Sequence, residues 1–186
     1  MMSNYLESAE KQFQYYKQLG DKTFDQLSDE ALFWRQSDHQ NSIAIIVNHL
    51  WGNMMSRWTD FLHTDGEKEW RERDLEFEDV ITSREDLLLK WEEGWSCVFK
   101  AIDTSKQVEP DTLVYIRNIG HTIVEAINRQ LCHYAYHVGQ IVIIGKALKD
   151  TEWISLSIPK GESSEYNAKR FAQNKHRGHF TEYENE

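Results

Sequence analysis

The chain has 186 residues, of which 40% are hydrophobic and 12% aromatic, and this composition and length predict one folded domain and exclude a disordered chain. The formal net charge of −10 at pH 7 argues against a nucleic-acid partner, because the chain would repel its phosphates. No segment approaches the roughly 18 apolar residues of a membrane span and the N-terminal residues lack a signal-peptide pattern, so we expect a cytoplasmic protein with no membrane partner.

Apolar residues recur at helical spacing in four long segments, and we expect a helix in each of them. The segments are approximately residues 4–19, 43–64, 83–103 and 123–148. Gly20 is expected to end the first helix. The last segment is apolar on nearly all sides, which is typical of a central helix.

The connections between these helices differ in character. Residues 65–82 are charged and lack apolar periodicity, which predicts a long crossover. Residues 112–122 are rich in β-forming side chains, which predicts an extended or hairpin-like excursion. We therefore predict an all-α fold, a four-helix bundle over residues 1–160 with a long crossover between the second and third helices. A C-terminal tail, partly extended or disordered, is expected over residues 161–186.

The most informative residues are His133 and His137, in the sequence HYAYH within the last expected helix. Residues four apart project from the same side of a helix, so both imidazoles can reach one metal ion. Eight histidines in a chain of this length produce such a pair by chance quite often, so the spacing alone is weak. The position of the pair in the most apolar helix strengthens the case for a metal site, because burying neutral imidazoles without partners is costly.

His49 lies in a second apolar stretch, IVNHLWGNMM, in the second expected helix. If the two helices face each other, His49, His133 and His137 form a three-nitrogen site. Neither helix has an Asp or Glu one turn away on the same face, so water or substrate would complete the coordination, as in catalytic metal sites. For His49 taken alone, an ordinary core histidine hydrogen-bonded to its neighbours is the better interpretation, and the triplet favours a metal.

The other residue types that could carry chemistry favour structural roles. Trp91 and Trp95 are expected to fill the core, and Cys132 is expected to be a buried, inert thiol. The charged run over residues 67–79 is expected to be a solvated loop or, alternatively, an ion-pair network at a subunit contact. The remaining histidines are expected to have no role in a site; they are His39, His63, His121, His176 and His179.

The segments around these histidines resemble the DinB-like, or YfiT-like, superfamily of bacterial metal-binding four-helix bundles. The resemblance rests on His49 in NSIAIIVNHLWGNMMSRWTDFLHTDGEKEWRERDLEF, on His133 and His137 in HYAYHVGQI, and on the later SLSIPKGESSEYN. These segments look most like one uncharacterised bacterial subgroup. The resemblance implies zinc or nickel bound by His49, His133 and His137, and a homodimer.

Some members of that superfamily are S-transferases that use bacillithiol, mycothiol or glutathione. The resemblance therefore implies a metal-dependent S-transferase acting on small electrophiles, with a low-molecular-weight thiol as co-substrate. The same site could activate water in a hydrolase, or the metal could be structural in a non-catalytic, stress-associated binding protein. Gln140, about one turn after His137, is expected to orient the site or its substrate.

A catalytic site needs an entry from solvent, and we expect a pocket lined mainly by apolar and aromatic groups. Histidines sealed beneath Trp or Tyr side chains would favour the structural role. We also expect a homodimer because the last helix is apolar nearly all round and Trp51 and Trp58 lie on different faces of the second helix.

Overall fold

The computed structural model describes residues 2–182, which form six α-helices and a two-stranded antiparallel sheet. The α-helices are α1 (Met2–Phe24), α2 (Asp29–Phe33), α3 (Ile43–Trp58), α4 (Arg84–Ser105), α5 (Ile123–Lys149) and α6 (Ser163–Phe171). The strands are β1 (Leu113–Ile116) and β2 (Ile119–Thr122), and the 3₁₀ helices are η1 (Arg73–Phe77), η2 (Asp150–Glu152) and η3 (Phe180–Glu182).

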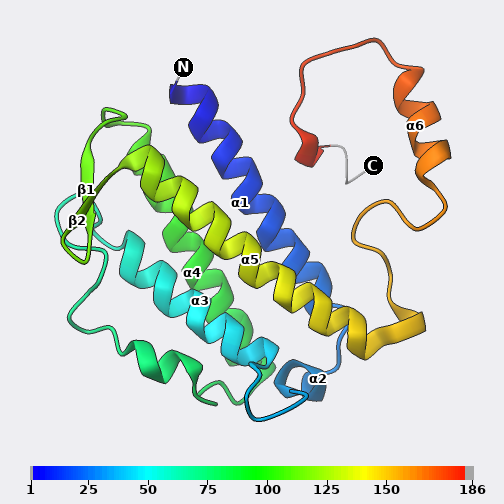
Figure 1. The fold of residues 1–186 in the computed structure, drawn as a ribbon, viewed down its shortest axis with the longest axis horizontal. Helices are drawn as coiled ribbons and strands as arrows, with labels where there is room; N and C mark the ends of the chain where they lie inside the picture. Colours follow the sequence, from blue (N-terminus) through cyan, green and yellow to red (C-terminus); the bar gives the residue numbers. More distant parts are fainter. Residues whose placement is uncertain (1, 183–186) are drawn as a thin grey trace.

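The four longest helices, α1, α3, α4 and α5, lie side by side around one core (Figure 1). Both α1 and α3 pack against α4 and α5. Among the largest fully buried side chains are Trp91, Trp95 and Tyr134, so the two tryptophans fill the core as predicted. The expected helical character is confirmed, with a small sheet added to it. Within residues 2–182, no helix has the length and hydropathy needed to cross a bilayer.

Polar N-caps begin the helices that carry the histidines. The Ser42 hydroxyl accepts a hydrogen bond from the amide of Ile45 at the start of α3. Thr122 and Glu125 form a complete capping box at the start of α5, each side chain accepting from the backbone amide of the other residue. These caps fix where α3 and α5 begin and therefore which of their turns carry His49 and His133.

Two predicted helix ends are wrong. Gly20 lies inside α1, which continues to Phe24, and a β-carbon at Gly20 would lie 2.4 Å from the Trp91 ring. The glycine therefore allows close packing of α1 on α4 instead of ending the helix. At the other position, α3 ends at Trp58 and not near residue 64, because Asp60 adopts a left-handed φ of 47° that breaks the helix.

The crossover and the hairpin are both present as predicted, and they are joined to each other. The crossover runs from α3 to α4, and η1 within it packs against α3. The turn between β1 and β2 places Arg117 and Asn118 at left-handed φ values of 53° and 60°. The Asp65 carboxylate accepts a hydrogen bond from each of their amides at 2.8 Å. This contact holds the hairpin turn beside the start of the crossover.

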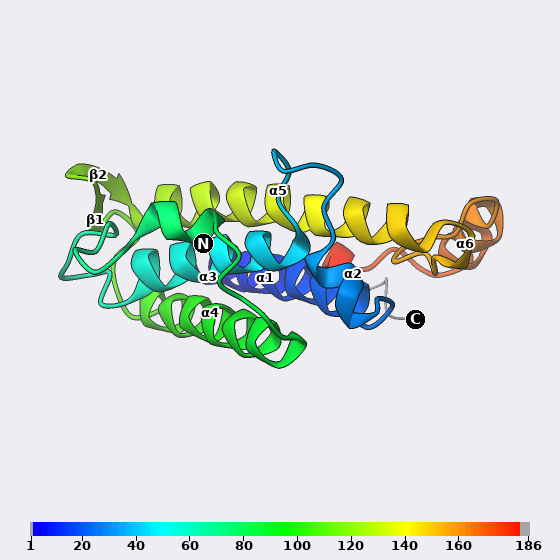
Figure 2. The same ribbon diagram turned by 90° about the horizontal axis from the view of Figure 1, so that it is seen from below.

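The chain beyond residue 160, where we expected a tail that is partly extended or disordered, contains α6 and η3. Figure 2 shows α6 beyond the end of the four long helices. The chain then returns to α1, where the ring centroids of Phe180 and Tyr15 are 5.7 Å apart and His179 is hydrogen-bonded to Ser8 at 3.0 Å. The last part of the predicted tail, residues 183–186, lies outside the described residues.

Candidate metal centre

Three histidines from two helices meet where α3 and α5 face each other. His49 comes from α3, and His133 and His137 come from successive turns of α5. One nitrogen of each ring lies within 4.8 Å of a nitrogen of the other two. His49 and His137 are buried, and His133 is half-buried. The structure therefore brings together the three residues that the sequence selected.

The spacing of the nitrogens suits a metal ion. The Nε2 atoms of His49 and His133 are 3.3 Å apart. Two nitrogens at about 2.0–2.1 Å from a tetrahedral zinc ion are separated by about 3.3–3.4 Å. The ring centroid of His137 lies 4.8 Å from those of both other histidines. A set of three imidazole nitrogens at these distances fits a divalent ion.

Hydrogen-bond acceptors hold the outer nitrogens of two of the rings. Glu76 Oε2 lies 2.8 Å from His49 Nδ1, and Gln140 Oε1 lies 2.8 Å from His137 Nδ1. A carboxylate oxygen and an amide oxygen only accept, so each Nδ1 carries the proton and donates it. Each Nε2 then keeps its lone pair for a ligand bond. This contact supports the orienting role expected for Gln140.

Glu76 is a site residue that the sequence analysis missed, because it lies in the charged run expected to be a solvated loop. The Glu76 side chain is 6% exposed, and Arg71 donates to both of its oxygens at 2.7 and 3.0 Å. Burial raises the pKa of the Glu76 carboxyl, but hydrogen bonds from His49 and Arg71 outweigh burial and hold the pKa below its ordinary value. Glu76 is therefore a buried carboxylate at neutral pH, in an ion-pair network within this chain.

One sequence feature could have indicated Glu76. Gly52 follows His49 by one helical turn, in the interior of α3. A β-carbon at Gly52 would lie 2.5 Å from Glu76 Oε1. Glycine in a helix interior costs about 1 kcal/mol relative to alanine, so its presence there points to the close approach of another segment.

The surroundings keep two of the three imidazoles neutral. Burial lowers the pKa of His133 to about 3, and the neighbouring histidines and the arginines 57 and 71 lower it in the same direction. Burial lowers the pKa of His137 to about 4, against the opposing effect of its hydrogen bond to Gln140. Metal binding requires neutral imidazole nitrogens. At pH 7 these two ligands need lose no proton before they bind.

The histidines open into a cavity of about 390 Å³, which we call the histidine cavity. Arg73 and Arg129 lie on its wall and are exposed, so the cavity is reached from solvent. Phe77 stacks on the His49 ring with 4.7 Å between centroids. The expectation of a mainly apolar and aromatic lining is wrong, because most of the wall is polar. Its other residues are Asn53, Arg57, Arg71, Arg117 and Gln130.

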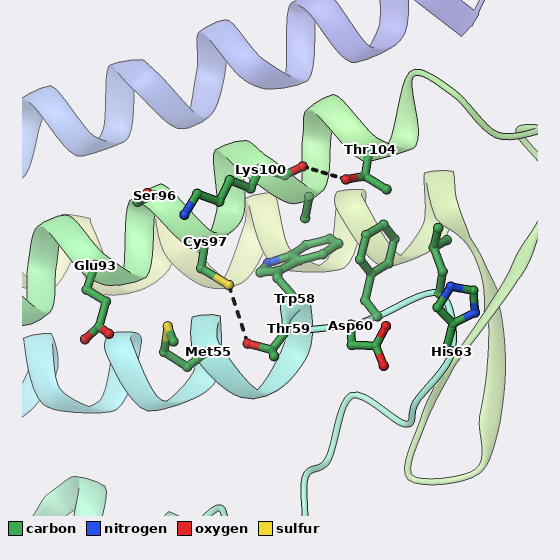
Figure 3. Close-up of a pocket in the computed structure, with 13 residues that line it drawn as sticks. Met55, Trp58, Thr59, Asp60, His63, Glu93, Ser96, Cys97, Lys100 and Thr104 are labelled. Atoms are coloured by element: carbon green, nitrogen blue, oxygen red, sulfur yellow. Dashed lines mark hydrogen bonds between the residues drawn. The ribbon is translucent and has the colours of Figure 1, made fainter.

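A second cleft, of about 460 Å³, lies between α3 and α4 and is called the cysteine cleft here (Figure 3). Its thiol, Cys97, faces the Thr59 hydroxyl with 3.8 Å between sulfur and oxygen (Figure 3). Burial raises the pKa of the Cys97 thiol, so the thiol is protonated at neutral pH. Cys132, expected to be buried, is exposed, because it projects from α5 about 100° away from its neighbour His133.

Within the part of the chain that the structure describes, the three histidines are the one group of His, Cys, Asp and Glu placed closely enough to share a metal ion. The protein thus carries a three-histidine cluster, on two facing helices, of the kind that can hold such an ion. It belongs to the family described as "Protein of unknown function (DUF1572)", which it matches over residues 1–162. Comparison with curated proteins and with solved structures gave no match.

Proposed function

We propose that the three histidines bind a divalent metal ion, zinc or nickel, and that the protein is a thiol S-transferase of the DinB-like superfamily that acts on small electrophiles. The observation that carries the proposal is the opening of three imidazole nitrogens into a cavity reached from solvent. Structural zinc sites are closed by four protein ligands, whereas three protein ligands leave a position for a substrate.

The surrounding residues would act by holding the ligands and admitting two small molecules. A divalent ion bound here supplies Lewis acidity, which lowers the pKa of a thiol so that thiolate is available near pH 7. Glu76 and Gln140 hold the Nδ1–H groups of His49 and His137, and Arg71 holds Glu76 in turn. In the transfer, the thiol sulfur bonds to the electrophilic carbon, the leaving group departs with its electron pair, and the thiol proton passes to solvent.

The proposal is tested with zinc-reconstituted protein, N-acetylcysteine as the thiol and monobromobimane as the electrophile. Thiol consumption should exceed that of the His137→Ala protein and should disappear when a chelator is added. His63→Ala, which changes a histidine of the cysteine cleft, is the matched control and should retain the activity. Equal rates for wild type and His137→Ala would overturn the transferase assignment.

Two other results of the same experiment would reassign the site. Chelator-sensitive hydrolysis of p-nitrophenyl acetate without a thiol would identify a hydrolase. If chelator lowers the melting temperature but neither reaction occurs, the metal has a structural role in a non-catalytic protein.

We also infer that the packing of α1, α3, α4 and α5 is the four-helix bundle of the DinB-like superfamily. The long crossover between α3 and α4 and the placement of ligands on facing core helices support this inference, because bundles build metal sites in that way. An experimental structure with a different helix connectivity would contradict it.

We propose in addition that the protein is a homodimer in which α5 contributes to the interface. Tyr136 and Ile143 are 63% and 61% exposed, and they lie two turns apart on one outward side of α5. Exposed apolar side chains on one helix face are commonly covered by a symmetric partner. Light scattering that gives the chain mass of 22.1 kDa at all concentrations would contradict the dimer.

A further inference from the structure

The histidine cavity is lined by five arginines, although the chain as a whole has a net charge of −10. They are Arg57, Arg71, Arg73, Arg117 and Arg129, and no Asp or Glu of residues 2–182 is among the residues that line the cavity. A group of this size in an acidic protein concentrates positive charge at one place. The cavity therefore has the opposite charge to most of the surface.

The nearby carboxylates do not balance these arginines. Glu67 contacts Arg57, Arg71 and Arg117, with nitrogen–oxygen distances of 3.1, 3.0 and 3.3 Å. Glu76 is held by Arg71. The Asp65 carboxylate is already engaged by three backbone amides, of residues 67, 117 and 118. Even with all three carboxylates counted, five guanidinium groups leave a positive excess, to which a divalent metal would add.

Three of the arginines are placed at the entrance, each from a different segment. Arg73 lies over the Phe77 ring, 5.1 Å from its centroid, and Phe77 itself stacks on His49. Arg117 is 58% exposed at the hairpin turn that Asp65 holds in place. Arg129 lies one helical turn before His133, on the same side of α5 as both histidine ligands. The separation between Arg129 and His133 is thus about one helical turn.

Deeper in the cavity, a buried donor lacks a partner. Arg57 is 7% exposed, and its Nε finds no hydrogen-bond acceptor among the described residues. The Arg57 guanidinium therefore adds a buried positive charge beside the cavity. The buried Gln130 Oε1 likewise has no hydrogen-bond partner within residues 2–182.

We propose that the thiol used at this site is an acidic one, whose carboxylate or phosphate group is bound by Arg73, Arg117 and Arg129 while its sulfur reaches the three histidines. This inference rests on the proposed function and adds the substrate class. Guanidinium groups bind carboxylate and phosphate through paired, charge-assisted hydrogen bonds. A thiol of the size of one amino acid spans the roughly 5–6 Å between adjacent turns of a helix.

The test compares two thiols that differ at one group. Calorimetry measures the Kd of N-acetylcysteine and of N-acetylcysteinamide for the zinc-reconstituted protein and for the Arg129→Gln and Arg73→Gln variants. The preference for the acid over the amide should fall about fivefold in each variant, because one charge-assisted contact is lost at a partly exposed position. The ratio of the two Kd values is compared between wild type and variant, so that the difference in pKa between the two thiols cancels.

Arg170→Gln, on α6, is the matched control and should leave the preference unchanged. Circular dichroism of each variant checks that it folds. The proposal is overturned if the wild type binds acid and amide equally, or if Arg129→Gln and Arg73→Gln keep the full preference. Inorganic phosphate is added as a competitor, and displacement by phosphate at lower concentration than by N-acetylalanine identifies the acid group as a phosphate.

A further probe separates this inference from the proposed function. N-acetylalanine carries the same carboxylate without the sulfur, and its binding is measured with metal-free protein. Arginine-dependent binding of N-acetylalanine together with no thiol consumption would support the anion site and refute the transferase. Turnover of acid and amide thiols at equal rates would support the transferase and refute the anion site.

Discussion

The cysteine cleft and the histidine cavity are of similar size, about 460 and 390 Å³. The cysteine cleft holds Cys97, a residue type that is often nucleophilic, but burial raises the pKa of its thiol and keeps it protonated. The histidine cavity holds imidazoles kept neutral by burial and arginines in excess over carboxylates. The environment of a group, more than its residue type or the volume of the cavity beside it, thus indicates a functional site.

Removing a histidine ligand should give the largest difference in zinc affinity between variants of the two cavities. His133→Ala should lower zinc affinity more than about 100-fold, because it deletes one of three ligands, whereas deleting a group that only orients a ligand costs about 10–100-fold. His63→Ala, in the cysteine cleft, should change nothing. Elemental analysis after equilibrium dialysis against zinc measures both. Equal zinc contents for the two variants would show that the ligands have been assigned wrongly.

Removing the charge that orients His49 should have the next largest effect. Glu76→Gln should weaken zinc binding by about 10–100-fold, because the acceptor of the His49 Nδ1–H loses its charge. The matched control is Glu93→Gln, whose carboxylate lies in the cysteine cleft and accepts from Trp51. Competition with a chromophoric chelator gives both affinities. An unchanged affinity for Glu76→Gln would remove this carboxylate from the site.

The lowered pKa values of the two histidines on α5 should make the metal-free protein sensitive to acid. His133 and His137 have folded pKa values of about 3 and 4, against an ordinary value of 6.5. As pH falls below about 6.5, the unfolded chain binds protons that the folded chain does not, so the free energy of unfolding decreases down to about pH 3. Urea denaturation of chelator-treated protein measures this decrease, which should be smaller in His133→Gln. The same pH dependence in the wild type and in His133→Gln would contradict the lowered pKa of His133.

Changes in the cysteine cleft should have the smallest effect. Cys97→Ala should leave zinc affinity and thiol consumption unchanged and should cost only about 1 kcal/mol of stability, the typical loss for a small truncation. Cys132→Ala, at an exposed position, is the control for stability. Steady-state kinetics and urea denaturation measure the two effects. Loss of turnover in Cys97→Ala alone would move the reaction to the cysteine cleft.

The part of the candidate site that lies on helices could be predicted from the sequence, because helix geometry is local. His133 and His137 are four positions apart, so their common side of the helix followed from spacing, and the apolar stretch around His49 indicated a second helix that could face them. Glu76 and Arg117 could not be found in this way. They reach the cavity through the crossover and the hairpin turn, whose positions depend on long-range contacts such as Asp65 to the turn amides.

The fold shows the same division. The four long helices, the crossover and the hairpin followed from periodicity and β propensity, which report on each segment alone. Gly20 was predicted wrongly because the sequence alone does not distinguish a glycine that ends a helix from a glycine that makes room for a neighbouring ring. The Trp91 ring that explains it comes from a helix far along the chain.

The arginines of the histidine cavity also have a kinetic consequence. An approaching acidic molecule first meets the field of a chain with net charge −10 and only then that of the arginines. Salt screens charges that act through solvent over more than about 8 Å at physiological ionic strength, and it screens contacts inside a cavity less. Added salt should therefore first speed the encounter by removing the distant repulsion, and only at higher concentration weaken the bound state.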